Sequence, residues 1–477
     1  MLDPHHSRPI DVHRWSDHPE VRALINDLWD RHFQPWATKS TRGPKPKTRH
    51  KDQLKVLLLD LYVAWTTDPE LAIGVHLNNS EWRTNSRYNA LHLSKVIVEY
   101  VHHLAELGLI DLSPGSFSGP GAMANRNARI RAATPLQALF HRAKFGLGDI
   151  GHSKDRECVI LRGEDGKPIE YEDTVDTRKM RRKLRTYNDR LARTFVDIPT
   201  LDQPFVDRAI TTGPRAGRVQ RLPIGPSNQF VRRVFSRGRW DLNGRYYGGW
   251  WQQIDSELRK QIHINDVPMV EVDYRAQHIN ILSIEAGAGP IEGDPYDLTE
   301  GYLEGVDRTT QRKYLKYLAL TAINAKDRTT AFRAFRDNYP KGDPGKRFTN
   351  DELDRILEEF VRRTPQLRPS LFADQGIRLM HIDSQIAERV LRWCAIKDLP
   401  VLCVHDSFII DYNHSLLLKL AMSLASKAVL GVSLAVSQNF VGLDDLEGEK
   451  LRADYVEVRA LERTKGYLER KKVIAPA

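Results

Sequence analysis

The sequence predicts an α+β protein, and three observations predict it. Residues 270–274 alternate valine with acid, which is typical of a half-buried strand with both acids on one face. Residues 401–410 form two apolar runs around His405 and Asp406, which predicts two strands joined by a tight turn. Apolar residues at helical spacing occupy much of the remaining chain. We therefore expect an antiparallel sheet, a helical region between its two parts and a further domain before it.

Composition limits the class of protein. The 477 residues suffice for two or three domains, and 41% hydrophobic residues allow real cores. No apolar run is long enough to cross a membrane, and the first residues lack a secretory pattern. Three cysteines without metal-ligand spacing fit a reducing compartment, so we expect a cytoplasmic protein. The net charge of +10 favours a polyanionic partner such as nucleic acid, although a merely soluble basic protein has the same charge.

Residues 1–145 combine helices with a basic hairpin. Apolar helices are expected at 51–65 and 91–109, and Gly108 can end the second one in the left-handed conformation. Two short strands around a loop rich in Gly, Pro and Ser are expected within residues 111–132. This order of elements indicates a domain that is separate from the acidic strands.

This order resembles a winged helix-turn-helix. In that family the last helix enters the major groove and the hairpin, or wing, contacts the DNA backbone. A winged helix used for protein contacts remains an alternative, because a fold does not fix a function. The resemblance implies DNA contacts near the start of that helix and on the wing, from Arg87, Tyr88, Asn89, Arg126, Arg129 and Arg131.

Residues 146–243 predict a basic connecting region. Residues 177–194 form a strongly basic helix, for which a solvated surface is the default interpretation and a nucleic-acid backbone the alternative. Between 208 and 245 arginines are interleaved with aromatic residues, which suits gripping phosphates and stacking on bases. Arg232 and Arg233 belong to this stretch and are candidate nucleic-acid contacts.

A helical region is expected between the two acidic strands. Arg312 and Lys316 lie one turn apart on the same face, and Asn324 follows two turns later on roughly the same side. Two cations on one face suit a triphosphate, although such a pair alone is more often a surface feature. In the rest of the chain we expect helices at 379–393 and 416–430 and a closing strand at 432–436. Residues 441–477 predict a charged peripheral tail.

Residues 244 to about 412 together resemble the polymerase A superfamily, that is, the family A DNA polymerases and the single-subunit phage-type RNA polymerases. Gly244-Arg245 is similar to the Gly-Arg pair that helps to hold the primer–template end. Asp273-Tyr274 is similar to motif A, whose aspartate binds both metal ions. The resemblance covers roughly a third to a half of the chain and excludes the part that resembles a winged helix.

Two further motifs complete this resemblance. Arg312-x-x-x-Lys316 is similar to motif B on the fingers helix, where these cations grip the incoming triphosphate. His405-Asp406-Ser407 is similar to motif C, and the serine is the form that phage RNA polymerases carry. No single motif is specific, but their order and spacing agree with the family.

The fold that the resemblance implies is a palm-like antiparallel sheet with helical fingers, preceded by the winged helix. Two departures leave the choice between ribonucleotides and deoxyribonucleotides open. His278 stands at the position of the sugar-discriminating residue, and Asn324-Ala325 replaces the Tyr-Gly that normally follows motif B. The implied thumb-like region is 146–243. The implied palm consists of 244–288 and 378–440, and the implied fingers, 289–377, lie between its two segments.

The resemblance implies template-directed nucleotidyl transfer with two Mg²⁺ ions, for which Mn²⁺ is an alternative. Asp273 and Asp406 would hold the ions, while Glu271 is either a third ligand or a solvated acid. Lys316 would act in catalysis and, with Arg312, would bind the triphosphate. The residues implied to line the nucleotide pocket or to hold primer and template are Tyr274, His278, Asn324, Arg245, His405, Arg232 and Arg233. The implied partners are a DNA or RNA template, a primer and nucleoside triphosphates.

Other functions remain open at this point. One is a non-catalytic DNA-binding replication initiator or regulator that carries a polymerase-like body. Another is a single-subunit RNA polymerase or a primase-like enzyme, and a third is a metal-dependent nuclease, because paired carboxylates also cleave phosphodiesters. The winged-helix resemblance suggests recruitment to a particular DNA site, such as the origin of a mobile element.

Overall fold

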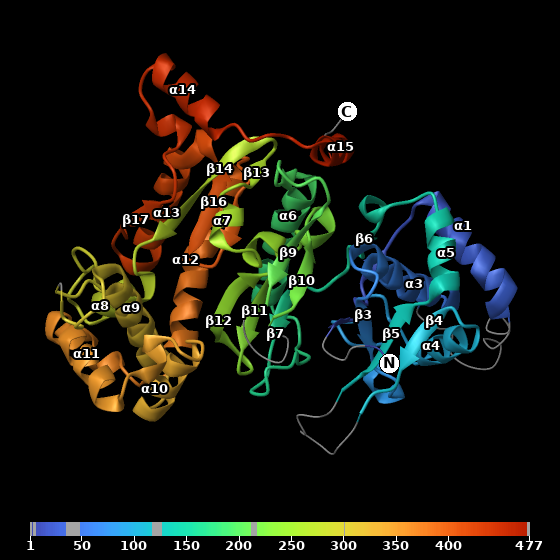
Figure 1. Cartoon of the computed structure of the whole chain (residues 1–477), viewed down its shortest axis with the longest axis horizontal. Helices are drawn as coiled ribbons and strands as arrows, with labels where there is room; N and C mark the ends of the chain where they lie inside the picture. The colour runs from blue at the N-terminus through green and yellow to red at the C-terminus, as the bar shows by residue number, and fades with distance from the viewer. Residues whose placement is uncertain are drawn as a thin grey trace.

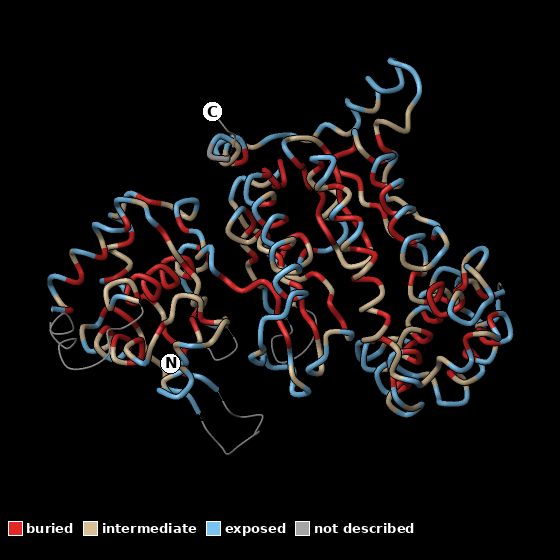
Figure 2. The backbone as a smooth tube through the Cα atoms, turned by 180° about the vertical axis from the view of Figure 1, so that it is seen from behind, coloured by how far each residue is buried: buried red, intermediate tan, exposed pale blue. Residues whose placement is uncertain are grey.

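The computed structural model describes residues 2, 6–34, 48–116, 126–210, 217–299 and 301–474. They form an α+β architecture with three hydrophobic cores, in an N-terminal part, a central body of sheets and a helical region. Figure 1 shows the central body between the other two parts. The buried segments, red in Figure 2, follow the same division. In this part of the chain no helix is both long and apolar enough to cross a membrane.

The N-terminal part packs helices against a four-stranded sheet of order β1-β3-β5-β4. Helix α3 is buried along most of its length, because most of its positions are apolar. The hairpin β4–β5 follows α4 directly, so the expected order of helix and basic hairpin is present. The elements are α1 (Pro19–Leu28), α3 (His50–Thr67), α4 (Val96–Glu106), α5 (Thr134–Arg142), β1 (Ser7–Pro9), β3 (Ala72–Val75), β4 (Ile110–Ser113) and β5 (Ala128–Ala132).

The local predictions for this part are largely confirmed, with one shifted boundary. The first predicted helix and both predicted strands are present. The helix expected from residue 91 begins at Val96, because residues 84–95 form turns in which His92 has a left-handed φ of 51°. Most of the loop expected at 114–121 lies outside the described residues.

The central body contains both acidic strands. One sheet has the order β12-β11-β7, and the other has the order β15-β16-β14-β13-β8 with β17 paired to β14. Helix α12 packs on β12 and on α13. The elements are β7 (Val159–Leu161), α6 (Val175–Arg193), β8 (Val196–Asp197), β9 (Phe205–Ala209), β10 (Val219–Pro223), β11 (Arg232–Ser236), β12 (Arg239–Tyr247), α7 (Ser256–Arg259), β13 (His263–Ile264), β14 (Val267–Tyr274), α12 (Gly376–Ile396), β15 (Leu402–Val404), β16 (Ser407–Asp411), α13 (Ser415–Leu430) and β17 (Val436–Gln438).

Most of residues 146–243 belong to this body, whereas the segment up to β6 (Gly151–His152) belongs to the N-terminal part. The predicted connecting region is therefore divided between two cores. Cys158, Leu184 and Phe235 belong to the same buried cluster as Val272 and Phe408. The physical reason is that β11 and α6 bury apolar faces against the sheet and helices on either side, which basic composition alone did not reveal.

The helical region follows the acidic strand β14, as expected. Helix α8 (Gln277–Glu285) packs in the same core as α9 (Arg308–Asn324), α10 (Arg328–Asp337) and α11 (Asn350–Arg363). The whole region is inserted between β14 and α12, so the chain leaves the sheet after one acid and returns before the other.

The C-terminal segment is only in part the peripheral tail that was predicted, because its last helix docks on the central body while the helix before it has no buried residue. It forms α14 (Glu449–Arg459) and α15 (Lys465–Ile474). Tyr467 of α15 is completely buried and donates a hydrogen bond to Asp266 at 2.8 Å. Arg470 forms an ion pair with Asp197 of β8 at 2.7 Å. Weak apolar periodicity failed to predict this docking because ion pairs provide most of it.

Candidate active site

The acids of the two predicted motifs lie on neighbouring strands. In the antiparallel ladder between β14 and β16, Asp273 stands opposite Ser407, the residue after Asp406. The backbone N–H of Tyr274 points to the carbonyl of Asp406 at 3.4 Å. His405 and Asp406 form the two-residue turn between β15 and β16, with His405 at a left-handed φ of 59°. The sheet therefore places two acids, 133 residues apart in sequence, at one edge.

The electrostatics of the pair confirm that its members are close. Burial raises the pKa of the Asp273 carboxyl to about 7, and the negative charges of Asp406 and Glu271 add to this rise while Lys316 opposes it. The Oδ1 atom of Asp273 is buried and has no hydrogen-bond partner among the described residues. A buried acceptor without a partner is uncommon in folded proteins and indicates a place for a donor or a cation.

One of the two predicted phosphate-binding cations is available at this site. Lys316 is exposed on α9, and no carboxylate of the described residues lies within ion-pair distance of its ammonium group. The positive charge of Lys316 lowers the pKa of the Asp273 carboxyl, so Lys316 lies near the acids. Arg312, one turn earlier, is instead paired with Asp294 and lies over the ring of Tyr296 at 5.8 Å.

A second cluster adjoins the acids, and sequence analysis missed its central residue. Asp383 of α12 accepts hydrogen bonds from Arg245 and lies 3.1 Å from Nε2 of His278. Burial alone would lower the pKa of Arg245, but Asp383 and, less strongly, Asp406 raise it. Asp383 is 1% exposed and lies on the apolar face of its helix. An acid at an apolar position of a helical pattern is the sequence signal that could have identified it as a site residue.

His405 completes the link between the two clusters. Burial and the charge of Arg245 lower the pKa of His405, so its imidazole is neutral at pH 7. Its ring contacts the ring of Tyr247 of β12 at 5.1 Å between centroids, and its Nδ1 atom is buried without a partner in the described part of the chain. The predicted residues Arg245, His278 and His405 are thus brought together beside the acid pair.

Two predicted site residues of the acidic strand, Tyr274 and Glu271, take other places. Tyr274 is 1% exposed and donates a hydrogen bond to the carbonyl of Met422, because strand alternation turns it away from Asp273; this corrects its predicted nucleotide contact. Both carboxylate oxygens of Glu271 accept hydrogen bonds, from Ser407 at 2.6 Å and from Arg259 at 3.1 Å, so it is not free to be a third ligand.

Asn324 closes α9 and lies against Gly376 at the start of α12, where an added Cβ would come within 2.1 Å of its Oδ1 atom. Its side chain is exposed, so its predicted nucleotide contact stays a prediction. Arg233 is structural: it is 5% exposed and donates to the carbonyl of Gly244 and to Glu388. Its predicted primer or template contact is corrected, because its guanidinium holds β12 against α12.

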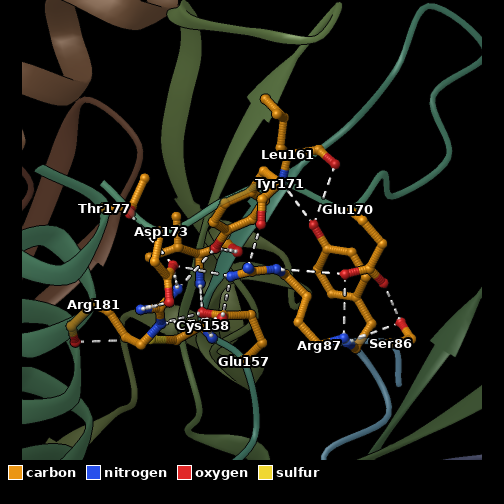
Figure 3. Close-up of polar contacts among 12 residues, drawn as sticks. Ser86, Arg87, Glu157, Cys158, Leu161, Glu170, Tyr171, Asp173, Thr177 and Arg181 are labelled. Atoms are coloured by element: carbon orange, nitrogen blue, oxygen red, sulfur yellow. Dashed lines mark hydrogen bonds and ion pairs between the residues drawn. The ribbon is translucent and has the colours of Figure 1, made fainter. Parts of the chain in front are cut away.

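The predicted DNA contacts before α4 are occupied within the chain. As Figure 3 shows, Arg87 reaches from the N-terminal part into a cluster of acids, where it pairs with Glu157 and Asp173 and lies over the ring of Tyr171 at 3.5 Å. The Tyr88 hydroxyl donates to the carbonyl of Ile169 at 2.9 Å. These residues join the N-terminal part to the central body, and this joint replaces their predicted role.

Asn89 and the arginines of the hairpin differ in whether their side chains are free to contact a partner such as DNA. Asn89 is 9% exposed and its side chain bonds to the backbone of Leu93, so it stabilises the turns before α4. Arg131 is neutralised by Glu70 and Asp111. Arg129 bonds to Ser7 and to its own hairpin, and no carboxylate of the described residues lies within ion-pair distance of it. Arg129 and the exposed Arg126 are therefore the hairpin cations left for a partner.

The acid pair has the chemistry of a site for a hard divalent cation. Carboxylate oxygens are the donors that Mg²⁺ prefers, and Mg²⁺ is commonly bound by one or two carboxylates together with water and substrate phosphates. The buried, unpartnered oxygen of Asp273 and the adjacent Asp406 fit this pattern. Within the described ranges no group of three or more His, Cys, Asp or Glu side chains could hold a metal ion by itself.

Comparison with known proteins adds a distant likeness. No protein-family model matches the sequence, and no curated protein matches it. The POL domain of Pol1 from M. smegmatis, solved in complex with DNA primer-template and dNTP, is similar in structure with a TM-score of 0.29 and 11% sequence identity. The alignment covers 90% of this chain and 67% of that chain.

Proposed function

We propose that this protein is a metal-dependent, template-directed nucleotidyltransferase. The observation that carries the proposal is the pairing of β14 with β16, which sets Asp273 beside Asp406. The positive charge of Lys316 also acts on this pair, because it lowers the pKa of Asp273. Two acids and a free cation at one sheet edge suit the binding of a metal ion together with a polyphosphate. The template-directed reaction is the one that the order of the four sequence motifs implies.

Asp273 and Asp406 would hold Mg²⁺ or Mn²⁺ at this edge. When bound, such an ion lowers the pKa of an attacking hydroxyl and neutralises charge on the phosphate under attack. A cation near Asp273 also lowers the pKa of its carboxyl from about 7, so the ionised form that binds metal becomes the stable form. The acids therefore bind and orient the reacting groups.

Lys316 would bind the triphosphate and stabilise the charge that develops on the leaving pyrophosphate. Its positive charge lowers the pKa of Asp273, and no carboxylate of the described residues lies within ion-pair distance of its ammonium group. Arg312 would add a second contact after exchanging Asp294 for phosphate. Arg245 and His405, held by Asp383 and Tyr247, would position the primer end or the template.

The hairpin of the N-terminal part is proposed to contact the DNA backbone through Arg126 and Arg129. These two arginines lie on the β4–β5 hairpin, and no carboxylate of the described residues lies within ion-pair distance of either. Phosphate contacts of this kind give affinity without sequence preference. The proposal for the hairpin is independent of the catalytic one.

The test is a nucleotide-incorporation assay with the full-length protein and Mg²⁺, comparing dNTPs with NTPs on primed and unprimed DNA and RNA templates. Asp406→Ala is expected to abolish incorporation and to leave DNA binding intact. The matched control is Asp241→Asn, which removes an exposed carboxylate of β12.

Incorporation by the Asp406→Ala variant at the rate of the unmodified protein would remove the catalytic assignment. Degradation of labelled DNA without added nucleotides would identify a nuclease instead. Binding of DNA without incorporation under any of these conditions would identify a non-catalytic DNA-binding protein.

A further inference from the structure

A buried cluster of charges lies where the N-terminal part meets the central body, away from the acid pair. Strand β2 (Arg14–Trp15) pairs with β6 (Gly151–His152), so Arg14 stands opposite His152. The N–H of Ser153 donates to the carbonyl of His13 at 2.8 Å. Arg156 follows on the same segment and contacts the ring of Phe230 at 4.5 Å, next to the start of β11.

The two acids of this cluster are already occupied. Asp60 accepts hydrogen bonds from Arg8 at 2.7 and 2.8 Å and from Arg14 at 3.2 Å. Asp11 accepts from the backbone of His13 at 3.0 Å and pairs with His152 at 2.7 Å. Arg14 lies only 3.6 Å from Asp11 and thus shares both carboxylates.

Two guanidinium groups of the cluster remain without a carboxylate. Arg156 is 9% exposed, and its Nε atom is buried with no hydrogen-bond partner among the described residues. Arg232, the first residue of β11, likewise has no ion pair within the described ranges. Burial, together with the charges of Arg232 and Arg14, lowers the pKa of Arg156 to about 10, although the charge of Asp11 opposes this fall.

His13 adds a third unsatisfied group on the same side. Its Nδ1 atom is buried and has no partner in the described part of the chain. Burial lowers the pKa of His13 to about 3, and the neighbouring charges of Arg156 and Arg232 contribute to this fall. The cluster as a whole contains Arg8, Arg14, Arg156 and Arg232 against Asp11 and Asp60, which leaves two positive charges uncompensated.

Such an arrangement is unfavourable for the fold alone. Removing a charge from water without a partner costs several kcal/mol, and buried cations are therefore paired in most proteins. Two unpaired guanidinium groups that repel each other are stabilised by an anion that accepts bidentate hydrogen bonds, and phosphate matches the guanidinium fork in geometry and charge.

We propose that Arg156, Arg232 and His13 form a phosphate-binding site at the junction between the N-terminal part and the central body. The phosphate is supplied either by a nucleic-acid backbone that passes between these parts or by a free phosphate compound. The site does not depend on the proposed nucleotidyl transfer, because none of its residues belongs to the acid pair or its neighbours.

The experiment compares the full-length protein with an Arg156→Gln/Arg232→Gln variant by thermal unfolding in sodium phosphate and in sodium chloride of equal ionic strength. Phosphate is expected to raise the melting temperature of the unmodified protein by several degrees and to leave the variant unchanged. In chloride the variant is expected to melt at the same or a higher temperature, because the repulsion is removed. An Arg142→Gln/Arg193→Gln variant loses the same charge at exposed positions and should respond to phosphate normally.

Binding of a labelled oligonucleotide identifies the source of the phosphate. A several-fold loss of affinity in the Arg156→Gln/Arg232→Gln variant, with a smaller salt dependence, assigns the site to a nucleic-acid backbone. Unchanged oligonucleotide affinity together with phosphate-dependent stabilisation assigns it to a free phosphate compound. Equal stabilisation of protein and variant by phosphate, or none in either, overturns the proposal and leaves an adventitious ion only. If the double variant does not fold, the half-buried Arg232→Gln alone serves in the same comparison.

Discussion

The buried carboxyl group of Asp273 is suited to binding a cation, but without a cation it lowers the free energy of unfolding of the protein. The pKa of its carboxyl is raised to about 7 by burial and by neighbouring acids, above an ordinary value near 4. A carboxyl whose pKa is raised on folding binds its proton more tightly in the folded state. The free energy of unfolding therefore falls as the pH rises from about 4 to about 7, and it stays low above pH 7.

Asp273→Asn is thus expected to stabilise the protein without metal. In EDTA at pH 8 we expect the free energy of unfolding to rise by about 1–3 kcal/mol, because the substitution removes a buried charge beside Asp406. At pH 4.5 the gain should disappear. Urea unfolding at both pH values measures it, with Asp241→Asn as the control. A variant that is no more stable than the unmodified protein at pH 8 would contradict the repulsion inferred for the pair.

Lys316 gives a second prediction at this scale. Lys316→Ala is expected to lower the rate of nucleotide incorporation by about 10²–10³-fold, since it removes the cation that faces the triphosphate. Lys313→Ala, at another exposed position of the same helix, is the matched control and should keep its activity. Steady-state kinetics with varied nucleotide distinguishes weaker binding from slower chemistry. Equal loss in both variants would point to damage of the helix instead.

The positions of single side chains could be predicted from the sequence where the alternation of a strand or the order of local motifs determines them. The alternation of residues 270–274 predicted that Asp273 leaves the buried face, and the structure agrees. The same alternation turns Tyr274 into the core, which the family resemblance obscured. The partners of Arg233 and Arg245 lie on α12, more than a hundred residues away, so only tertiary structure reveals them.

At the scale of elements, α15 is fixed to the sheet edge by a set of charged contacts. Asp266, between β13 and β14, receives hydrogen bonds from Arg463, Tyr467 and Lys471. Burial alone would raise the pKa of Asp266, but these three hydrogen bonds outweigh it and lower the pKa to about 2. A carboxyl whose pKa is lowered on folding stabilises the fold above its unfolded pKa near 4, and this stability is lost as the pH falls toward 2.

Asp266→Asn is therefore expected to destabilise the protein at neutral pH. We expect a loss of about 1–2 kcal/mol at pH 7, reduced by solvent screening because the side chain is partly exposed. The variant and the unmodified protein should converge as the pH falls below about 2. Hydrogen exchange of α15 follows the docking directly. Asp454→Asn on the exposed surface of α14 is the control. Protection of α15 that is unchanged in Asp266→Asn would exclude these contacts as its anchor.

Most elements followed from apolar spacing, and the exceptions have a physical cause. Helix α3 and the turn at His405 were predicted because their patterns are local. Helix α15 buries Tyr467 deeply but few other side chains, so its sequence shows no apolar stripe. Its docking depends on distant acids that its own sequence does not contain.

At the scale of the whole molecule, Arg87 fixes the N-terminal part to the central body. Its guanidinium meets Glu157, Asp173 and the ring of Tyr171 in one place, and Arg181 of α6 shares both acids (Figure 3). An arginine with an aromatic neighbour also suits nucleic acid, but the sequence analysis assigned Arg87 to DNA because it lies near the start of the last helix of the winged-helix resemblance. The same chemistry serves a joint when the acids come from the same chain.

Arg87→Ala is expected to loosen this joint by about 1–3 kcal/mol while both parts stay folded. Limited trypsin digestion should separate the N-terminal part from the central body faster than in the unmodified protein. The far-ultraviolet circular dichroism spectrum should not change. Arg83→Ala, at an exposed position of the same segment, is the control. Identical digestion of the variant and the unmodified protein would show that the joint does not depend on Arg87.

The insertion of the helical region between β14 and α12 has a consequence for how the acid pair is assembled. Closing a flexible segment of this length costs about 4 kcal/mol in its length-dependent part alone. The helices α8 to α11 share a core, so their collapse draws the two ends of the segment toward each other. The strands β14 and β16 can then pair at little further entropic cost. From this topology we expect the insert to condense before β14 and β16 pair, so that the acid pair forms only after the insert has folded.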